Sequence, residues 1–267
     1  MRQRVGTGLT QYVLWMSEEL LVIERHGEHV LILTMNRPDR HHALNHGLAT
    51  ALVEALEQAE SDPSVRVVIL TGSGVRSFCA GQDMLEQSGL EGKRGSPKSV
   101  AAYLAIDRFE KSPLPIIAAI NGYCYGGGAA LAISCDIRYA ADTATFRLPG
   151  AEYGLVVGAA TLPRLVGSAR AKELIFSARK FNAMEAEKWG LVNEVFTNDA
   201  LLLEVISLAV QIVKNSTVAV KESKRVIDAA TIDLGVGQLE DEINRGLRGS
   251  PDQAERFLKA TRRVTGK

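Results

Sequence analysis

The sequence predicts an α/β (α+β) fold in which strands alternate with helices up to about residue 146 and helices dominate afterwards. Residues 65–72 (VRVVILTG) and 115–122 (PIIAAING) are short apolar runs that end in glycine. Such runs are typical of strands that are buried on both faces of a sheet. Residues 43–62 instead place apolar side chains at helical spacing, with polar side chains on the opposite face.

The remaining elements follow from the same kinds of pattern. Residues 19–38 read as two strands around a turn at Arg25–Glu28. Glycines and a proline make residues 84–99 a predicted mobile loop. The other expected elements are a helix at 99–112, a strand and turn at 137–146, successive helices from about 159, and a short strand at 190–196.

The chain shows no internal repeat and no linker rich in Pro, Gly or Ser, which favours one α/β core with an attached helical part. We assign residues 16–200 to the core and residues 201–267 to a C-terminal helical region that packs on the core or on a neighbouring subunit. Residues 1–15 contain two arginines and no acidic residue, and Met16 is a plausible natural start. Residues 1–15 are therefore interpreted as an extension or cloning remnant; a transit peptide is the alternative, although the segment is short and poor in serine.

The charge balance bears on partners and location. Lys+Arg and Asp+Glu each number 31, and there is no basic run, so neither nucleic acid nor an acidic membrane surface is an expected partner. No stretch reaches the roughly 18 unbroken apolar residues of a membrane span. The three cysteines lack a CxxC spacing, which predicts reduced thiols and a cytoplasmic protein.

Three familiar motifs are incomplete or absent, so the sequence predicts no dinucleotide cofactor, no metal site and no serine hydrolase elbow. The run Gly72-x-Gly74-x-x-Ser77 lacks the third glycine of a dinucleotide site and the helix that should follow. His42 and His46 share a helical spacing, but no third metal ligand accompanies them. A Gly-x-Ser-x-Gly elbow is absent.

Two short stretches are more informative together than alone. FCAGQDM (78–84) and GYCYGGGAA (122–130) each follow a predicted buried strand and bring small residues to its end. Small residues allow backbone N–H groups to approach a ligand, and a helix that begins at the glycines favours negative charge. Two converging N–H groups would form an oxyanion hole; the alternative is a pair of tight strand-to-helix turns.

The order and spacing of several blocks resemble the crotonase superfamily, that is, the enoyl-CoA hydratase/isomerase family, over about residues 19–259. The blocks include LTMNRPDRHHALN, VRVVILTGSGVRSFCAGQDM and PLPIIAAINGYCYGGGAALAISCDIRYAADTATFRLP. The resemblance implies a core of repeated ββα units and a C-terminal helical trimerisation region. It also implies a homotrimer or a dimer of trimers that takes acyl-CoA thioesters as substrates.

The resemblance also implies which residues contact the thioester. The oxyanion donors fall on the backbone N–H of Gln82 and of Gly127, and no cofactor is expected besides the CoA of the substrate. Lys259 and Arg262 fall where the family's C-terminal tail meets the CoA phosphates. The expected CoA-binding residues are His41, Ala43, Leu44, Ala80, Gln82, Asp83, Met84, Gly126 and Gly127.

Both glutamates of the family's hydratases are missing, because their positions hold Ala130 and Gly150. A carboxylate pair normally activates water and delivers a proton, so standard hydration is expected to be weak or absent. Glu152, two residues beyond Gly150, is the candidate replacement base; an exposed loop glutamate is the alternative. Tyr125 and Tyr153 are read as packing residues.

The resulting prediction is an acyl-CoA-processing enzyme, similar to the lyases and isomerases of the family that act in fatty acid metabolism. It would stabilise a thioester enolate in the oxyanion hole and use non-standard acid and base residues. The alternative is a non-catalytic acyl-CoA-binding homologue. The acyl group and the reaction type are left open.

Overall fold

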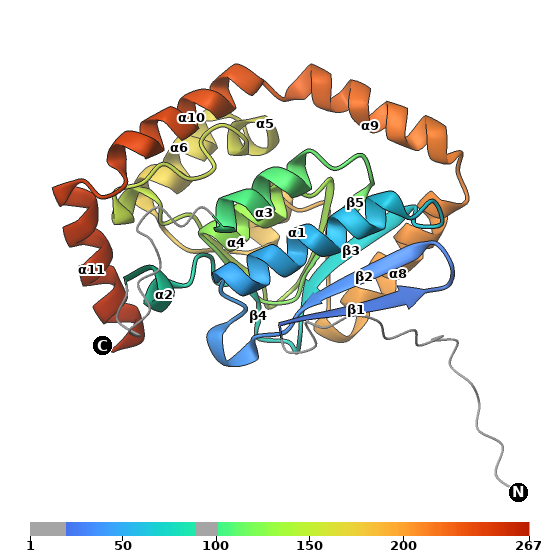
Figure 1. The fold of residues 1–267 in the computed structure, drawn as a ribbon, viewed down its shortest axis with the longest axis horizontal. Helices are drawn as coiled ribbons and strands as arrows, with labels where there is room; N and C mark the ends of the chain where they lie inside the picture. The colour runs from blue at the N-terminus through green and yellow to red at the C-terminus, as the bar shows by residue number, and fades with distance from the viewer. Residues whose placement is uncertain (1–19, 89–100, 267) are drawn as a thin grey trace, which may run out of the picture.

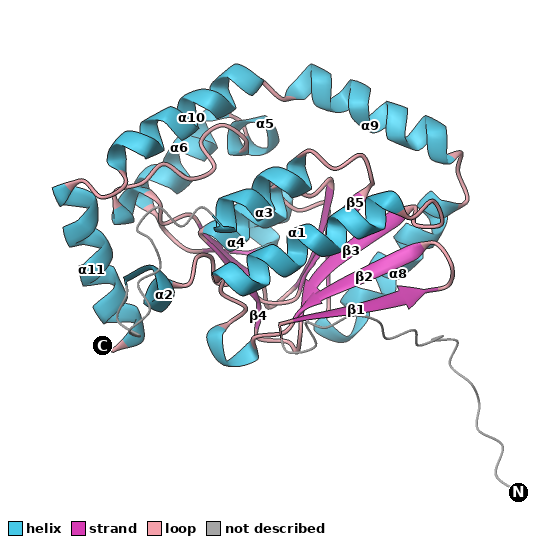
Figure 2. Ribbon diagram, in the orientation of Figure 1, coloured by secondary structure: helices cyan, strands magenta, loops and turns pink. Residues whose placement is uncertain are grey.

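The structure is a computed structural model that describes residues 20–88 and 101–266. Its larger sheet has six strands in the spatial order β1 (Leu21–His26), β2 (Val30–Met35), β3 (Val67–Gly72), β5 (Ile116–Ile120), β7 (Ile137–Ala141) and β10 (Glu194–Phe196). All neighbouring strands in this sheet run parallel except β1 and β2. Figure 2 shows β1, β2 and β3 of this sheet side by side. Every residue of β3 is buried, as its continuous apolar run predicted.

A second, smaller sheet carries the strand ends that matter for the site. It consists of β4 (Ser77–Cys79), β6 (Tyr123–Tyr125), β8 (Thr145–Arg147) and β9 (Phe181–Asn182). The strands β3, β5 and β7 of the larger sheet are each followed by a strand of the smaller one. This alternation between sheets is the repeated ββα arrangement that the resemblance implied, so the predicted fold class is confirmed.

Helices cover the larger sheet on both sides. The helix α1 (His46–Ser61) packs on β1, β2 and α3 (Ala101–Glu110), while α8 (Asn198–Val213) packs on β2, β3, β5 and β7. Figure 1 shows α1 in front of the sheet and α8 behind it. The helix α8, with which the predicted C-terminal region begins, therefore belongs largely to the core layer.

The other helices connect the strands or lie outside the core. The short ones are η1 (Pro38–Arg40), α2 (Met84–Ser88), α4 (Gly127–Ile133), η2 (Ala151–Tyr153), α5 (Leu162–Val166), α6 (Ser168–Ser177) and α7 (Ala183–Lys188). The C-terminal ones are α9 (Thr217–Thr231), α10 (Leu234–Leu247) and α11 (Pro251–Thr265), which form an outer arch (Figure 1). Within the described ranges no single helix is long and apolar enough to cross a bilayer, although α8 and α9 pass that test together as a pair bent by 107°.

Several predicted boundaries need correction. The turn at Arg25–Glu28 is shorter than expected, because Arg25 and His26 still pair with β2. The predicted loop at 84–99 begins with the helix α2, and its remainder from 89 lies outside the described residues, as do residues 1–15. The segment 137–146 contributes two strands, β7 and β8, instead of one strand and a turn.

The cysteines fit the prediction of reduced thiols. Cys79, Cys124 and Cys135 are free and buried. Burial raises the pKa of the Cys79 and Cys135 thiols to about 12, so neither carries an appreciable thiolate fraction near neutral pH.

Candidate active site

The ends of β4 and β6 bring the two predicted oxyanion segments together. These strands are parallel neighbours, with Ser77 opposite Tyr123 and Cys79 opposite Cys124, so their carboxyl ends meet at one edge of the small sheet. A Cβ atom placed on Gly127 would lie 3.5 Å from the backbone nitrogen of Gln82. The two predicted donor residues therefore lie beside each other.

Glycines make this close approach possible. A Cβ on Gly81, which has a φ of +95°, would lie 2.8 Å from the Tyr125 oxygen and 2.9 Å from the Gly127 nitrogen. A Cβ on Gly128 would lie only 2.2 Å from the Cys79 oxygen. Two stretches of backbone thus contact each other directly, and we call this contact between residues 79–82 and 126–128 the glycine seam.

Gly127 is the first residue of α4, and Gly126 is its N-cap. The first N–H groups of a helix have no carbonyl partner within that helix, so they point outward and carry partial positive charge. The Gly126 N–H donates to the Arg147 oxygen at 2.9 Å, which fixes the entry to the helix. The helix start therefore presents the Gly127 N–H at the glycine seam.

The segment 41–44, predicted to bind CoA, pairs with the other side of residues 80–83. The Ala80 N–H donates to the His41 oxygen, the Leu44 N–H to the Gly81 oxygen, and the Asp83 N–H to the Leu44 oxygen, at 2.7–3.0 Å. The Gly81 C=O and the Asp83 N–H both form hydrogen bonds with Leu44. The N–H of Gln82, which lies between them, therefore points away from Leu44. The predicted CoA-binding residues are thus brought together by backbone hydrogen bonds.

Side-chain hydrogen bonds of Asp83 and His42 stabilise the pairing between residues 41–44 and 80–83. One Asp83 oxygen accepts from the N–H groups of Leu85 and Glu86 at the start of α2, and the other pairs with Arg37 at 2.9 Å. The His42 ring accepts from the Arg37 N–H and donates to the Ser73 oxygen, and burial lowers its pKa. Because both ring nitrogens are occupied, His42 is not available to a metal in this geometry.

The positions of the two missing glutamates are closely packed. Ala130 is 9% exposed within α4. A Cβ on Gly150 would lie 2.9 Å from the Leu155 oxygen and 2.9 Å from a methyl group of Val157. A side chain at residue 150 would therefore require the following turn to move.

Glu152, the predicted base, is engaged by two guanidinium groups. One of its carboxylate oxygens pairs with Arg147 and the other with Arg263. Burial alone would raise the pKa of Glu152, but the hydrogen bonds and positive charge of Arg263 and Arg147 outweigh it and hold the pKa below its ordinary value. A carboxylate in this state accepts a proton poorly, so the geometry does not favour the base role. The sequence offered no signal for either arginine contact.

Tyr125 and Tyr153 both have partners inside the fold. The Tyr125 hydroxyl lies 2.7 Å from the Thr145 hydroxyl oxygen, and its ring stacks on Tyr123. Tyr153 meets the edge of the Phe257 ring in α11. Their reading as packing residues is consistent with these contacts.

A hollow of about 590 Å³ lies elsewhere, between α9 and the C-terminal end of α4. Arg164, Asp136 and Lys224 are among its lining residues, and the lining includes none of the predicted site residues. Lys224 pairs with Asp136 at 2.8 Å across it. The hollow belongs to the arch of the C-terminal helices and is separate from the glycine seam.

A core whose successive strands alternate between two sheets is the crotonase class of fold. Comparison with known proteins agrees, because the family model described as enoyl-CoA hydratase/isomerase matches residues 25–256. The chain belongs to this family, whose members act on acyl-CoA thioesters.

Individual relatives cover most of the chain. A mevalonyl-coenzyme A hydratase of Aspergillus fumigatus is 38% identical over 196 residues, which is 72% of each chain. A short-chain-enoyl-CoA hydratase of Clostridium acetobutylicum is 38% identical over 211 residues, 78% of this chain and 80% of the relative. The crystal structure of an enoyl-CoA hydratase/isomerase from Pseudoalteromonas atlantica has a TM-score of 0.81 at 30% identity and covers 92% of this chain and 97% of that one.

Proposed function

We propose that this protein binds acyl-CoA thioesters with the thioester carbonyl oxygen between the N–H groups of Gln82 and Gly127. Removal of a proton next to the carbonyl, or loss of a carboxylate there, leaves an enolate whose negative charge is concentrated on that oxygen. Backbone donors fixed before the reaction stabilise such charge without having to reorganise. The glycine seam is the single observation that carries this proposal.

The expected chemistry differs from two-glutamate hydration. Ala130 and Gly150 supply no carboxylate, and the turn that contains Leu155 and Val157 occupies the space beside Gly150. Reactions that need one base or none fit these residues better: double-bond isomerisation, decarboxylation, or hydrolysis of a C–C or thioester bond. The missing acids equally support the second candidate, an acyl-CoA binder without turnover.

We also propose that α9 and α10 contact another copy of the chain in a homotrimer or a dimer of trimers. Val226 and Ile227 of α9 are 63% and 60% exposed, and Leu239 of α10 is 54% exposed. Apolar side chains that gather on neighbouring helices commonly mark protein contacts. A mass of three or six chains by light scattering is expected, and a monomer at micromolar concentration would contradict the proposal.

Binding and hydration of crotonyl-CoA provide the test of function. We expect calorimetry to detect binding, and hydration to be at least about 100-fold slower than in a two-glutamate enzyme, because general acid–base catalysis contributes factors of that size. A hydratase of the family whose sequence carries both glutamates, assayed alongside, is the matched control. Turnover equal to that control would show that the missing pair is replaced, and failure to bind any CoA thioester would refute the proposal.

A further inference from the structure

Three consecutive residues of the turn η2 and its end contact one face of α11. Glu152 pairs with Arg263, and Tyr153 meets the edge of the Phe257 ring with centroids 6.4 Å apart. A Cβ on Gly154 would lie 3.0 Å from the Cα atom of Gln253. The turn therefore forms a docking surface for the last helix of the chain.

Arg147 connects the Glu152 carboxylate to the glycine seam. Besides pairing with Glu152, Arg147 donates from Nε to the Ala178 oxygen at 2.7 Å, and its own backbone oxygen accepts from Gly126. Arg147 thus links the docked α11 to the residue that precedes the Gly127 donor.

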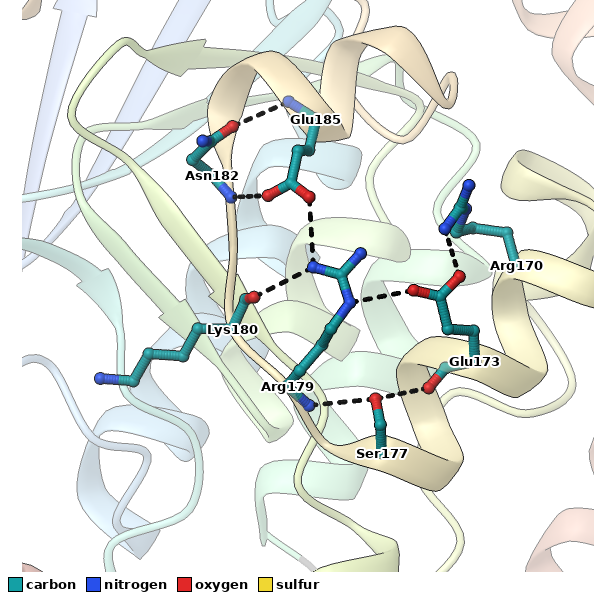
Figure 3. Close-up of polar contacts among 7 residues, drawn as sticks. All are labelled: Arg170, Glu173, Ser177, Arg179, Lys180, Asn182 and Glu185. Atoms are coloured by element: carbon teal, nitrogen blue, oxygen red, sulfur yellow. Dashed lines mark hydrogen bonds and ion pairs between the residues drawn. The ribbon is translucent and has the colours of Figure 1, made fainter.

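On its other side, Arg147 contacts the turn that follows α6. Figure 3 shows Arg179 at its centre, with Nε donating to Glu173 and another nitrogen donating to Glu185 and to the Lys180 oxygen. These bonds hold the segment that presents the Ala178 oxygen to Arg147. Glu152 is consequently held by Arg147 on the core side and by Arg263 on the α11 side.

The helix α11 also packs on α2, which begins at Met84, one of the predicted CoA-binding residues (Figure 1). A helix that contacts both α2 and η2 braces the two segments that flank the glycine seam. Loosening α11 should therefore disturb ligand binding more than the chemical step.

We propose that Glu152 is a positioning residue that latches α11 across the acyl-CoA site by bridging Arg263 and Arg147, and that it is not the base. The expected effect on acyl-CoA binding rests on the proposed function. The bridge from Arg147 through Glu152 to Arg263 does not depend on it. The charged groups that face Glu152 are Arg147 from β8 and Arg263 from α11, and Tyr153 follows it in the chain.

The experiment compares Glu152→Gln, Arg263→Met and the double variant with the wild-type protein. Arg263 is 61% exposed along its side chain, so its replacement should leave folding intact even if Glu152→Gln does not. Glu222→Gln is the matched control, because Glu222 pairs only with Arg225 three residues along α9 in the pairs that the described residues make. Amide hydrogen exchange of α11, the KM and kcat for an acyl-CoA, and the pH profile are measured.

We expect faster exchange in α11 and a rise in KM of about 2- to 5-fold in each single variant, with little change in kcat, since partly exposed ion pairs contribute about that much. The double variant should resemble the single variants, because each single substitution already breaks the same bridge between Glu152 and Arg263. The acidic limb of the pH profile should survive in Glu152→Gln.

Two results would overturn the latch. A fall in kcat of about 100-fold or more in Glu152→Gln alone, with unchanged KM and a lost acidic limb, would identify a base. Unchanged amide exchange of α11 in both single variants would show that the bridge does not stabilise this helix. If the wild-type protein binds no acyl-CoA, the proposed function fails, and the exchange measurement still decides whether the latch exists.

Discussion

Replacement of Gly128 by alanine is expected to lower the free energy of unfolding by about 3 kcal/mol or more, because overpacking against backbone forces the chain to shift. The new Cβ would lie 2.2 Å from the Cys79 oxygen and 2.7 Å from the Cys79 carbonyl carbon. Neither atom belongs to a flexible side chain that could rotate away. Chemical denaturation with urea measures the change.

The same substitution at Gly237 is the matched control. Gly237 lies inside α10, and a Cβ there would have no neighbouring atom within 4 Å. Alanine should therefore stabilise the protein by about 0.5–1 kcal/mol through its better helix propensity. Equal and small effects at both glycines would show that the glycine seam is not closely packed.

Replacement of Gly127 by proline is expected to lower kcat by ~100- to 1000-fold relative to Gly127→Ala, the loss typical of one missing oxyanion donor. Proline removes the N–H and places ring atoms where it pointed. It is otherwise suited to the first position of a helix, where no intrahelical bond is lost. Gly126 has φ 54° and ψ −121°, the mirror image of the polyproline conformation that residues before proline prefer, so the local backbone can remain.

Gly127→Ala separates the missing donor from the added volume. Its Cβ would lie 3.5 Å from the Gln82 nitrogen, an ordinary contact, and the N–H is kept. Thermal unfolding of both variants checks that the fold survives. If the proline and alanine variants turn over equally, Gly127 is not a donor.

The larger sheet was predictable because its central strands leave a strong sequence signal. β3 and β5 are buried along their whole length, and a continuous apolar run ending in glycine indicates such a strand. The smaller sheet was not predictable in the same way. β4, β6 and β8 have three residues each, too few for an alternating pattern to emerge.

Some residues of the candidate site could also be predicted from the sequence, and others could not. Gln82 and Gly127 could be chosen from sequence because the segments that contain them follow the recognisable strands β3 and β5 of the larger sheet, and because the order of the blocks resembles a known family. The surroundings of Glu152 could not, since Arg263 lies 111 residues away along the chain. Only the docking of α11 on η2 brings the two together, and it turns a candidate base into a group that is already paired.

The most direct test of the central claim is the vibrational frequency of the thioester carbonyl in a bound, non-reacting acyl-CoA labelled with ¹³C at that carbon. Difference infrared spectra are recorded for the wild-type protein, Gly127→Ala and Gly127→Pro. We expect the carbonyl band to move to lower frequency on binding to the wild-type and alanine proteins, because two N–H donors polarise the bond, and to move much less in the proline variant. A bound carbonyl whose frequency matches that in water, or shifts equally in all three proteins, would contradict the oxyanion hole at Gln82 and Gly127.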